Sequence, residues 1–104
     1  MVPRYSLCVD LELTDVQSGI QIKRQTKDLS LFGCGVETTQ PFPKGTNVKI
    51  KISHLGAIVE AFARVVYANP ELGMGIVFTT LGPEDERTLV GWIADLMAEE
   101  RSSE

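Results

Sequence analysis

Residues Lys27–Val36, KDLSLFGCGV, place a carboxylate and a hydroxyl two positions apart and a glycine three positions later. Strand-forming residues lie on both sides, so the segment forms either a tight corner between two strands or the rim of a pocket. Residues two apart in an extended chain share a face, which predicts that Asp28 and Ser30 project together. Gly33 would let the chain turn without a side chain in the way.

Strand patterns flank this segment on both sides. Residues 20–28, IQIKRQTKD, alternate apolar and polar side chains, and residues 34–39, CGVETT, predict a short strand that stops at a loop with two prolines. Residues 4–13, RYSLCVDLEL, alternate along their whole length. They predict one continuous strand with Leu11 and Leu13 on its buried face.

The remaining chain predicts three more strands and then a helix. Residues 47–53, 57–68 and 74–80 are strand-like runs between turn signals. After them the period changes, because Pro83 stands at a first helical position and three acidic residues follow it. Apolar residues then recur at helical spacing, with Trp92 expected in the core.

These patterns predict an all-β fold. Six short strands over residues 4–78, followed by a helix over residues 83–100, favour a six-stranded antiparallel β-barrel with one C-terminal α-helix. Closure of the sheet hides the strand edges that would otherwise aggregate. At 104 residues the chain is expected to form a single domain, residues 1–104.

Composition excludes several classes of protein. Apolar residues make up 43% and charged residues 23% of the chain, as in an ordinary globular protein. No apolar run approaches the ~20 residues that cross a bilayer, so we expect no membrane insertion and a cytoplasmic location. Residues 52–104 carry three basic and nine acidic side chains, so an anionic ligand would use the N-terminal half. Binding of DNA or RNA polymers is disfavoured.

Residues for catalysis and metal binding are scarce. The only histidine, His54, lies beside a turn, and the two cysteines, Cys8 and Cys34, lack metal-site spacing and are expected to be buried thiols. The sequence therefore offers few ligands for a zinc site and few residues for a histidine-dependent catalytic triad. We expect no enzyme, no catalytic residue, no metal and no cofactor.

Asp28 and Ser30 carry complementary hydrogen-bonding chemistry, since an aspartate accepts while a serine both donates and accepts. Together they could address the edge of a guanine, whose ring N–H and amino group are adjacent donors. Several basic residues lie nearby in the N-terminal half: Arg4, Lys23, Arg24 and Lys27. Alternatively, both side chains bond their own backbone to shape a turn that Gly33 ends.

The chain resembles a PilZ domain in five segments: RY (4–5), DLSLFG (28–33), PFPKGTNVKIKI (41–52), GMGIVF (73–78) and GPEDERTLVGWI (82–93). The hexad DLSLFG and the GMGIVF strand are the specific parts. The resemblance implies a six-stranded barrel with a C-terminal helix. It also implies binding of the bacterial second messenger cyclic di-GMP, as a ligand rather than a cofactor.

The resemblance implies roles for four residues. Asp28, Ser30 and Gly33 fill an Asp-x-Ser-x-x-Gly motif that encloses a guanine, and Arg4 matches the second arginine of an Arg-x-x-x-Arg motif that holds phosphates and guanine edges. The first arginine of that motif would fall one position before Met1. Either the chain is cut from a longer protein, or the domain is a degenerate member of the family.

Two functions remain open at this point. The first is a non-enzymatic receptor that binds cyclic di-GMP through Arg4, Asp28, Ser30 and Gly33 and relays its level to a partner. The second is a PilZ-like interaction module that does not bind the nucleotide. In both, the expected protein partner is a bacterial effector or a component of motility, pilus or polysaccharide machinery.

Overall fold

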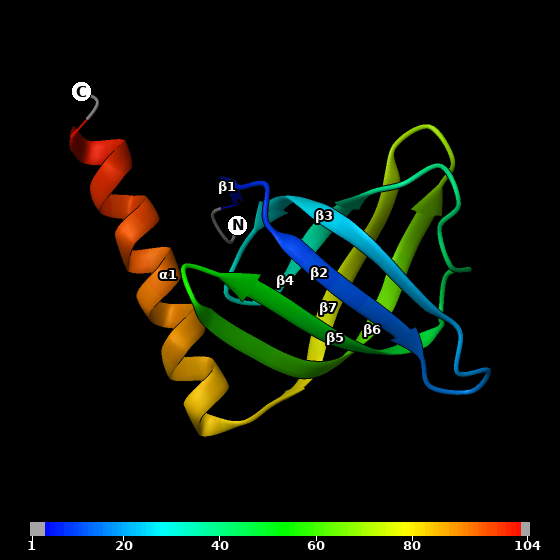
Figure 1. The fold of residues 1–104 in the computed structure, drawn as a ribbon. Helices are drawn as coiled ribbons and strands as arrows, with labels where there is room; N and C mark the ends of the chain where they lie inside the picture. The colour runs from blue at the N-terminus through cyan, green and yellow to red at the C-terminus, as the bar shows by residue number, and fades with distance from the viewer. Residues whose placement is uncertain (1–3, 103–104) are drawn as a thin grey trace.

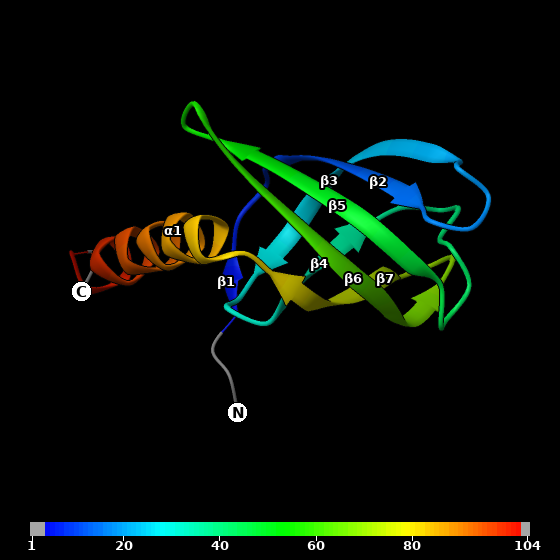
Figure 2. The same cartoon turned by 90° about the horizontal axis from the view of Figure 1, so that it is seen from below.

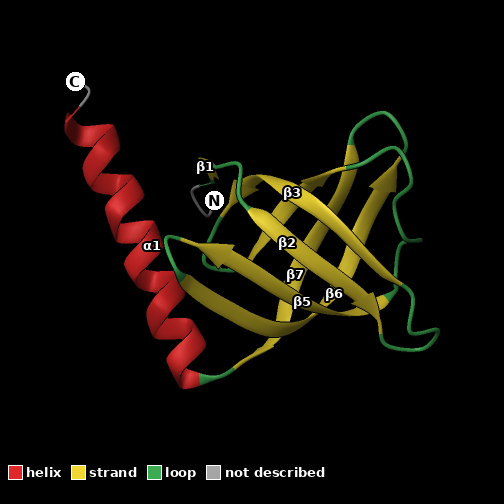
Figure 3. Ribbon diagram, in the orientation of Figure 1, coloured by secondary structure: helices red, strands yellow, loops and turns green. Residues whose placement is uncertain are grey.

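The computed structural model describes residues 4–102, which form a β-barrel with a long helix at one end (Figures 1 and 3). In chain order the elements of this part are β1 (Tyr5–Ser6), β2 (Asp10–Asp15), β3 (Gln21–Leu29), β4 (Gly33–Glu37), β5 (Asn47–His54), β6 (Ala57–Asn69), β7 (Gly73–Leu81) and α1 (Pro83–Ser102). The predicted all-β fold with one C-terminal helix is confirmed. The helix ends later than the predicted residue 100.

Six strands close the barrel through antiparallel pairs. Around the ring, β2 pairs with β5, β5 with β6, β6 with β7, β7 with β4, β4 with β3 and β3 with β2. The short β1 pairs with the end of β3 that β2 leaves uncovered. Both β1 and β2 pair with the same edge of β3. Together they occupy one strand position of the barrel, with a break between them.

The break between β1 and β2 corrects the prediction of one continuous strand over residues 4–13. Ser6 pairs with Asp28 and Asp10 with Gln25, so the first strand has one extra residue in this interval. The buried Thr26 bridges the gap, because its hydroxyl donates to the carbonyl of residue 7 and accepts the N–H of residue 9. The backbone groups that lose their ladder partners are thereby satisfied.

The barrel encloses one apolar core. Its largest fully buried side chains come from every barrel strand and from the helix: Leu11, Leu13, Leu29, Ile50, Ile52, Met74, Ile76, Leu89, Val36, Val48, Val59 and Val65. Inward side chains alternate with exposed ones along β2, β5 and β6, as the period of a strand requires.

The helix lies against one end of the barrel, beside β1 (Figures 1 and 2). Leu89, Trp92 and Ile93 are buried and join the core, which confirms the predicted position of Trp92. The start of the helix is fixed to the sheet, because a carboxylate oxygen of Asp85 accepts the N–H of Glu60 at 3.0 Å. The helix thus covers one end of the barrel and leaves the outer face of β3 and β4 open.

Candidate functional site

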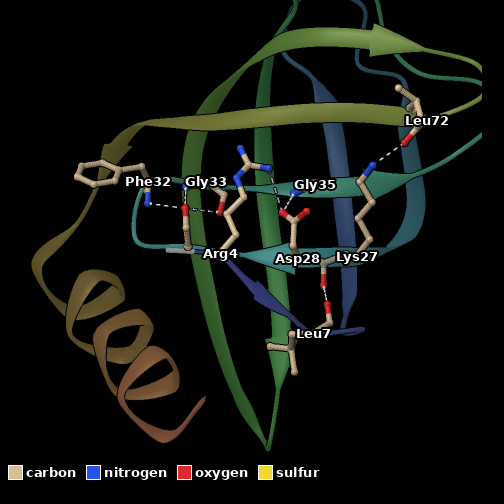
Figure 4. A network of polar contacts seen from close by, with 10 residues as sticks. Arg4, Leu7, Lys27, Asp28, Phe32, Gly33, Gly35 and Leu72 are labelled. Carbon is tan, nitrogen blue, oxygen red and sulfur yellow. Dashed lines mark hydrogen bonds and ion pairs between the residues drawn. The ribbon is translucent and has the colours of Figure 1, made fainter. Parts of the chain in front are cut away.

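A bulge at Lys27 decides which side chains of β3 face outward. The register of β3 against β4 shifts by one residue between Thr26 and Asp28. Thr26 and Leu29 are both buried, whereas Lys27 and Asp28 between them are half-buried and extend from the outer side of the strand (Figure 4). The bulge therefore brings two consecutive side chains, a cation and an anion, to one face.

The carboxylate of Asp28 is held by two donors on one of its oxygens. Oδ1 accepts the N–H of Gly35 at 2.8 Å and Nη1 of Arg4 at 3.2 Å. Within residues 4–102 no hydrogen bond reaches the other oxygen, Oδ2, and 22% of the side chain is exposed. One oxygen thus orients the group while the other is available as an acceptor.

Gly35 provides the space in which this carboxylate lies. A Cβ at position 35 would stand 3.0 Å from Oδ1 of Asp28 and 2.8 Å from Oδ2, and the second distance is closer than real Cβ contacts come. The φ angle of Gly35 is not in the left-handed region, so a turn does not require this glycine. Its missing side chain is what lets the carboxylate reach the backbone of β4.

Arg4 approaches Asp28 from the beginning of the chain. The pairing of Tyr5 with Leu29 brings Arg4 to the end of β3, within 3.2 Å of the carboxylate. The Arg4 side chain is 48% exposed, so solvent screens this ion pair and it contributes about 0–1 kcal/mol to stability. A contact this weak opens at little cost.

Ser30 and Asp28 each accept a backbone N–H of the segment that β4 begins, Gly33 for Ser30 and Gly35 for Asp28, while Leu29 between them is buried. Ser30 follows the end of β3, is 5% exposed, and its hydroxyl closes a turn. The hydroxyl oxygen accepts the N–H groups of Phe32 and Gly33, each at 3.2 Å, and the hydroxyl can donate to the carbonyl of Gly33 at 3.3 Å. The turn-shaping alternative describes Ser30 correctly.

Gly33 is required by a contact with the neighbouring strand. A Cβ at this position would fall 1.9 Å from the carbonyl oxygen of Ile76 in β7. Its φ angle is not in the left-handed region, so the glycine is needed here for space and not for its backbone conformation. Gly33 lets β4 approach β7 closely where the hexad ends.

Lys27 extends along the outer face on the other side of Asp28 from Arg4 (Figure 4). Its ammonium donates to the carbonyl oxygen of Leu72, in the β6–β7 loop, at 2.7 Å. Its Cε would be 2.8 Å from a Cβ at Gly35, so the aliphatic stem lies beside the same glycine as the carboxylate. Sequence reasoning noted this lysine as a nearby cation but did not place it in the site.

An aromatic ring continues the same row of the outer face. Gly35 pairs with Gly75 of β7, and Gly75 pairs with Tyr67 of β6. A Cβ at Gly75 would fall 2.0 Å from Cε2 of Tyr67, so the tyrosine ring occupies the space above this glycine. Asp28 and Tyr67 thus cover two neighbouring glycines, which places a hydrogen-bond acceptor near an aromatic ring.

A hollow of about 670 Å³ lies elsewhere on the barrel, over β2, β3 and β5. None of the four predicted site residues lines it. Three acidic and three basic side chains do: Asp10, Glu12, Glu37, Lys23, Arg24 and Lys51. Because these charges balance, the hollow has no net attraction for an anion.

The two cysteines differ in environment. Cys34 is buried in the core, where burial, and then the nearby negative charge of Asp28, raise the pKa of its thiol to about 12. Cys8 is exposed, so the prediction that both thiols are buried is wrong for Cys8. Neither cysteine lies in a group of three or more possible metal ligands anywhere in residues 4–102.

Comparison with protein families decides the identity of the fold. A family model described as the PilZ domain matches residues 3–95. This chain belongs to the PilZ domain family. No curated protein sequence matches the chain.

Solved structures, two of them of PilZ domains, share its fold. The PilZ domain of CeSA from a cellulose synthesizing bacterium has a TM-score of 0.74 and 21% identity, and the match covers 91% of this chain and 98% of that one. The PilZ domain of YcgR from Escherichia coli, solved with cyclic di-GMP, has a TM-score of 0.75 and 20% identity, with 98% and 94% covered. The Bacillus subtilis inhibitor of motility, MotI/DgrA, has a TM-score of 0.77 and 15% identity, with 97% and 52% covered.

The helix of this PilZ domain does not qualify as a membrane span. Among the described residues, no helix combines the length and apolar character that crossing a bilayer requires.

Proposed function

We propose that this PilZ domain is a non-enzymatic receptor that binds cyclic di-GMP on the outer face of β3 and β4 and relays its level to a protein partner. The observation that carries the proposal is the contact between Arg4 and Asp28, 3.2 Å apart. It joins the arginine before β1 to the hexad at the end of β3, the two segments that the family resemblance assigns to the nucleotide. The solved YcgR domain, of the same fold, holds cyclic di-GMP.

Asp28 is suited to accept the N–H groups of a guanine edge. Its Oδ2 has no hydrogen bond within residues 4–102, and its Oδ1 is anchored to the backbone of Gly35. A carboxylate already oriented by the protein loses little conformational freedom when a base binds. The ring of Tyr67, over the neighbouring glycine, adds a surface on which a planar base can pack.

Arg4 is suited to exchange its partner when the nucleotide arrives. In the free protein it donates to Oδ1 of Asp28, in a pair that solvent already screens. We expect a guanine amino group to take the place of Arg4 at Oδ1. The planar guanidinium would then bind a phosphate through charge-assisted hydrogen bonds.

Ser30 and Gly33 act in this proposal as positioning residues. The buried hydroxyl of Ser30 fixes the turn through the N–H groups of Phe32 and Gly33. The contact of Gly33 with β7 fixes where that turn ends. Both residues therefore hold the hexad in the shape that presents Asp28.

The tip of the hexad offers a surface for the relay to a partner. Leu31 and Phe32 are exposed, Phe32 to 60%, although both are large and apolar. With the end of β7 and with Leu89 and Val90 of α1 they line a groove of about 320 Å³. Because this loop follows Asp28 at the end of β3, a shift of the loop on nucleotide binding would change the groove, and a motility, pilus or polysaccharide protein could sense it.

Titration calorimetry with cyclic di-GMP tests the receptor function. We expect saturable heat for the natural chain and a loss of affinity of about tenfold to a hundredfold for Asp28→Asn, which keeps the shape but removes the charge. Glu60→Gln, on the outer face of β6, is the matched control and should bind normally. Absence of heat with the natural chain, in the presence of a cooperative melting transition, would contradict the proposal and favour the interaction module that does not bind the nucleotide.

A further inference from the structure

We propose that Lys27 is a second ligand-contacting cation of this site and binds one phosphate of the nucleotide, opposite Arg4. This inference rests on the proposed receptor function and extends it to a residue outside the two motifs of the family resemblance. Four observations carry it: the bulge, the position of the lysine stem, the charge of the site and the exchangeable partner of the ammonium.

The bulge is the reason that Lys27 reaches the site at all. In a regular strand consecutive side chains point to opposite faces, so the neighbour of an outward Asp28 would point into the barrel. The register shift between Thr26 and Asp28 removes that alternation. Thr26 and Leu29 fill the inward positions on either side, and Lys27 lies on the outer face with Asp28.

The stem of Lys27 lies next to the open oxygen of Asp28. Its Cε and Oδ2 of Asp28 are each 2.8 Å from the point where a Cβ of Gly35 would stand, and Arg4 donates to Oδ1. Figure 4 shows Arg4 and Lys27 on opposite sides of the carboxylate. A ligand that bonds Oδ2 therefore arrives beside Lys27.

The charge of the site favours a role for a second cation. Arg4 and Asp28 alone sum to zero, so a pocket of these two residues does not attract a dinucleotide whose phosphates are both negative. Lys27 makes the sum +1. A lysine ammonium acts as a point charge that suits a phosphate oxygen, while the fork of the arginine suits a bidentate contact.

The present partner of the Lys27 ammonium can be exchanged. The ammonium has three donors, and within residues 4–102 one of them is bonded, to the carbonyl of Leu72 in an exposed loop. A carbonyl is neutral, whereas a phosphate oxygen carries charge and makes the stronger hydrogen bond. The lysine can therefore turn to a phosphate, with water satisfying the exposed carbonyl.

Binding of cyclic di-GMP to charge variants of β3 tests this inference. Lys27→Met keeps the aliphatic stem and removes the charge. We expect it to raise Kd by about tenfold or more, and to weaken the dependence of Kd on salt, because one charge contact is lost. Lys27→Arg keeps the charge and should retain most of the affinity.

Lys23→Met is the matched control, because Lys23 lies on the same strand, is exposed and pairs with Glu12 at 3.7 Å, away from Asp28. It removes the same charge and should leave Kd and its salt dependence nearly unchanged. Equal Kd values for Lys27→Met and the natural chain, with affinity still reduced in Asp28→Asn, would overturn the role of Lys27 and leave the receptor function standing. No binding by the natural chain would overturn both. Melting temperatures verify that each variant is folded.

Discussion

Arg4 and Asp28 are 24 residues apart in the chain, yet Nη1 of the arginine lies 3.2 Å from Oδ1 of the aspartate. The contact exists because β1 pairs with the last residues of β3. The same oxygen accepts the N–H of Gly35, so the carboxylate joins three segments: the start of the chain, β3 and β4. This junction is the centre of the proposed nucleotide site.

Gly35→Ala is predicted to weaken nucleotide binding with little loss of stability. The new Cβ would come within 2.8 Å of Oδ2 of Asp28 and of Cε of Lys27, so both side chains must shift from their present positions. Both atoms belong to the ends of side chains, which can yield, and we expect the free energy of unfolding to fall by less than about 1 kcal/mol. Calorimetry should show Kd raised by about tenfold or more. Natural affinity in this variant would mean that the carboxylate position does not matter for binding.

Gly33→Ala is predicted to destabilise the fold. Here the new Cβ would lie 1.9 Å from the carbonyl oxygen of Ile76. This oxygen belongs to the backbone of β7, which cannot move without disturbing the sheet. We expect the free energy of unfolding to fall by about 1–3 kcal/mol or more, measured by urea denaturation. Gly35→Ala is the matched substitution on the same strand, and equal stability of the two variants would refute the close contact between β4 and β7.

Thr26→Val is predicted to loosen the first strand. Valine has nearly the same shape, but it leaves the carbonyl of Leu7 and the N–H of Val9 without the hydroxyl that bonds both. Urea denaturation should show a loss of about 1–3 kcal/mol in the free energy of unfolding. Thr79→Val, at an exposed position of β7, is the control and should change it by less than about 0.5 kcal/mol. An unchanged stability for Thr26→Val would show that the break does not depend on the threonine.

The fold is predicted to lose stability in alkaline solution because the thiol of Cys34 is buried. Burial raises the pKa of its thiol from 9.0 to about 12, so the unfolded chain releases this proton from about pH 9 while the folded chain keeps it. The stabilisation is complete below pH 9 and is lost as the pH rises toward 12. Cys34→Ala should therefore lose less stability across this range than the natural chain does. Parallel curves for the variant and the natural chain would contradict the raised pKa.

The barrel could be predicted from the sequence because its signals are local. Alternation along residues 47–53 and 57–68, the change of period at Pro83 and the acidic first turn of the helix depend only on neighbouring residues. Arg4 and Asp28 could be assigned to one site from the resemblance to a family. Their contact follows from the strand pairing of that fold.

The details of the site depend on residues distant in the chain. The break after β1 and the bulge at Lys27 are defined by how each strand pairs with its neighbour. The alternation of residues 4–13 therefore could not reveal the break, and the alternation of residues 20–28 could not reveal the bulge. For the same reason the sequence did not show that Gly33 faces the backbone of β7. For Ser30 the sequence allowed both a ligand contact and a turn. In the free protein Ser30 is buried and its hydroxyl bonds the backbone of the turn.

The backbone amide of Gly35 reports most directly on the central claim, because its N–H is bonded to the carboxylate oxygen of Asp28. The measurement is an amide NMR titration of the natural chain with cyclic di-GMP. We predict that the resonance of Gly35 shifts saturably, while that of Gly91, in the helix, stays in place. A titration in which Gly35 does not move, or in which only residues far from β3 and β4 respond, would contradict a nucleotide site at Asp28.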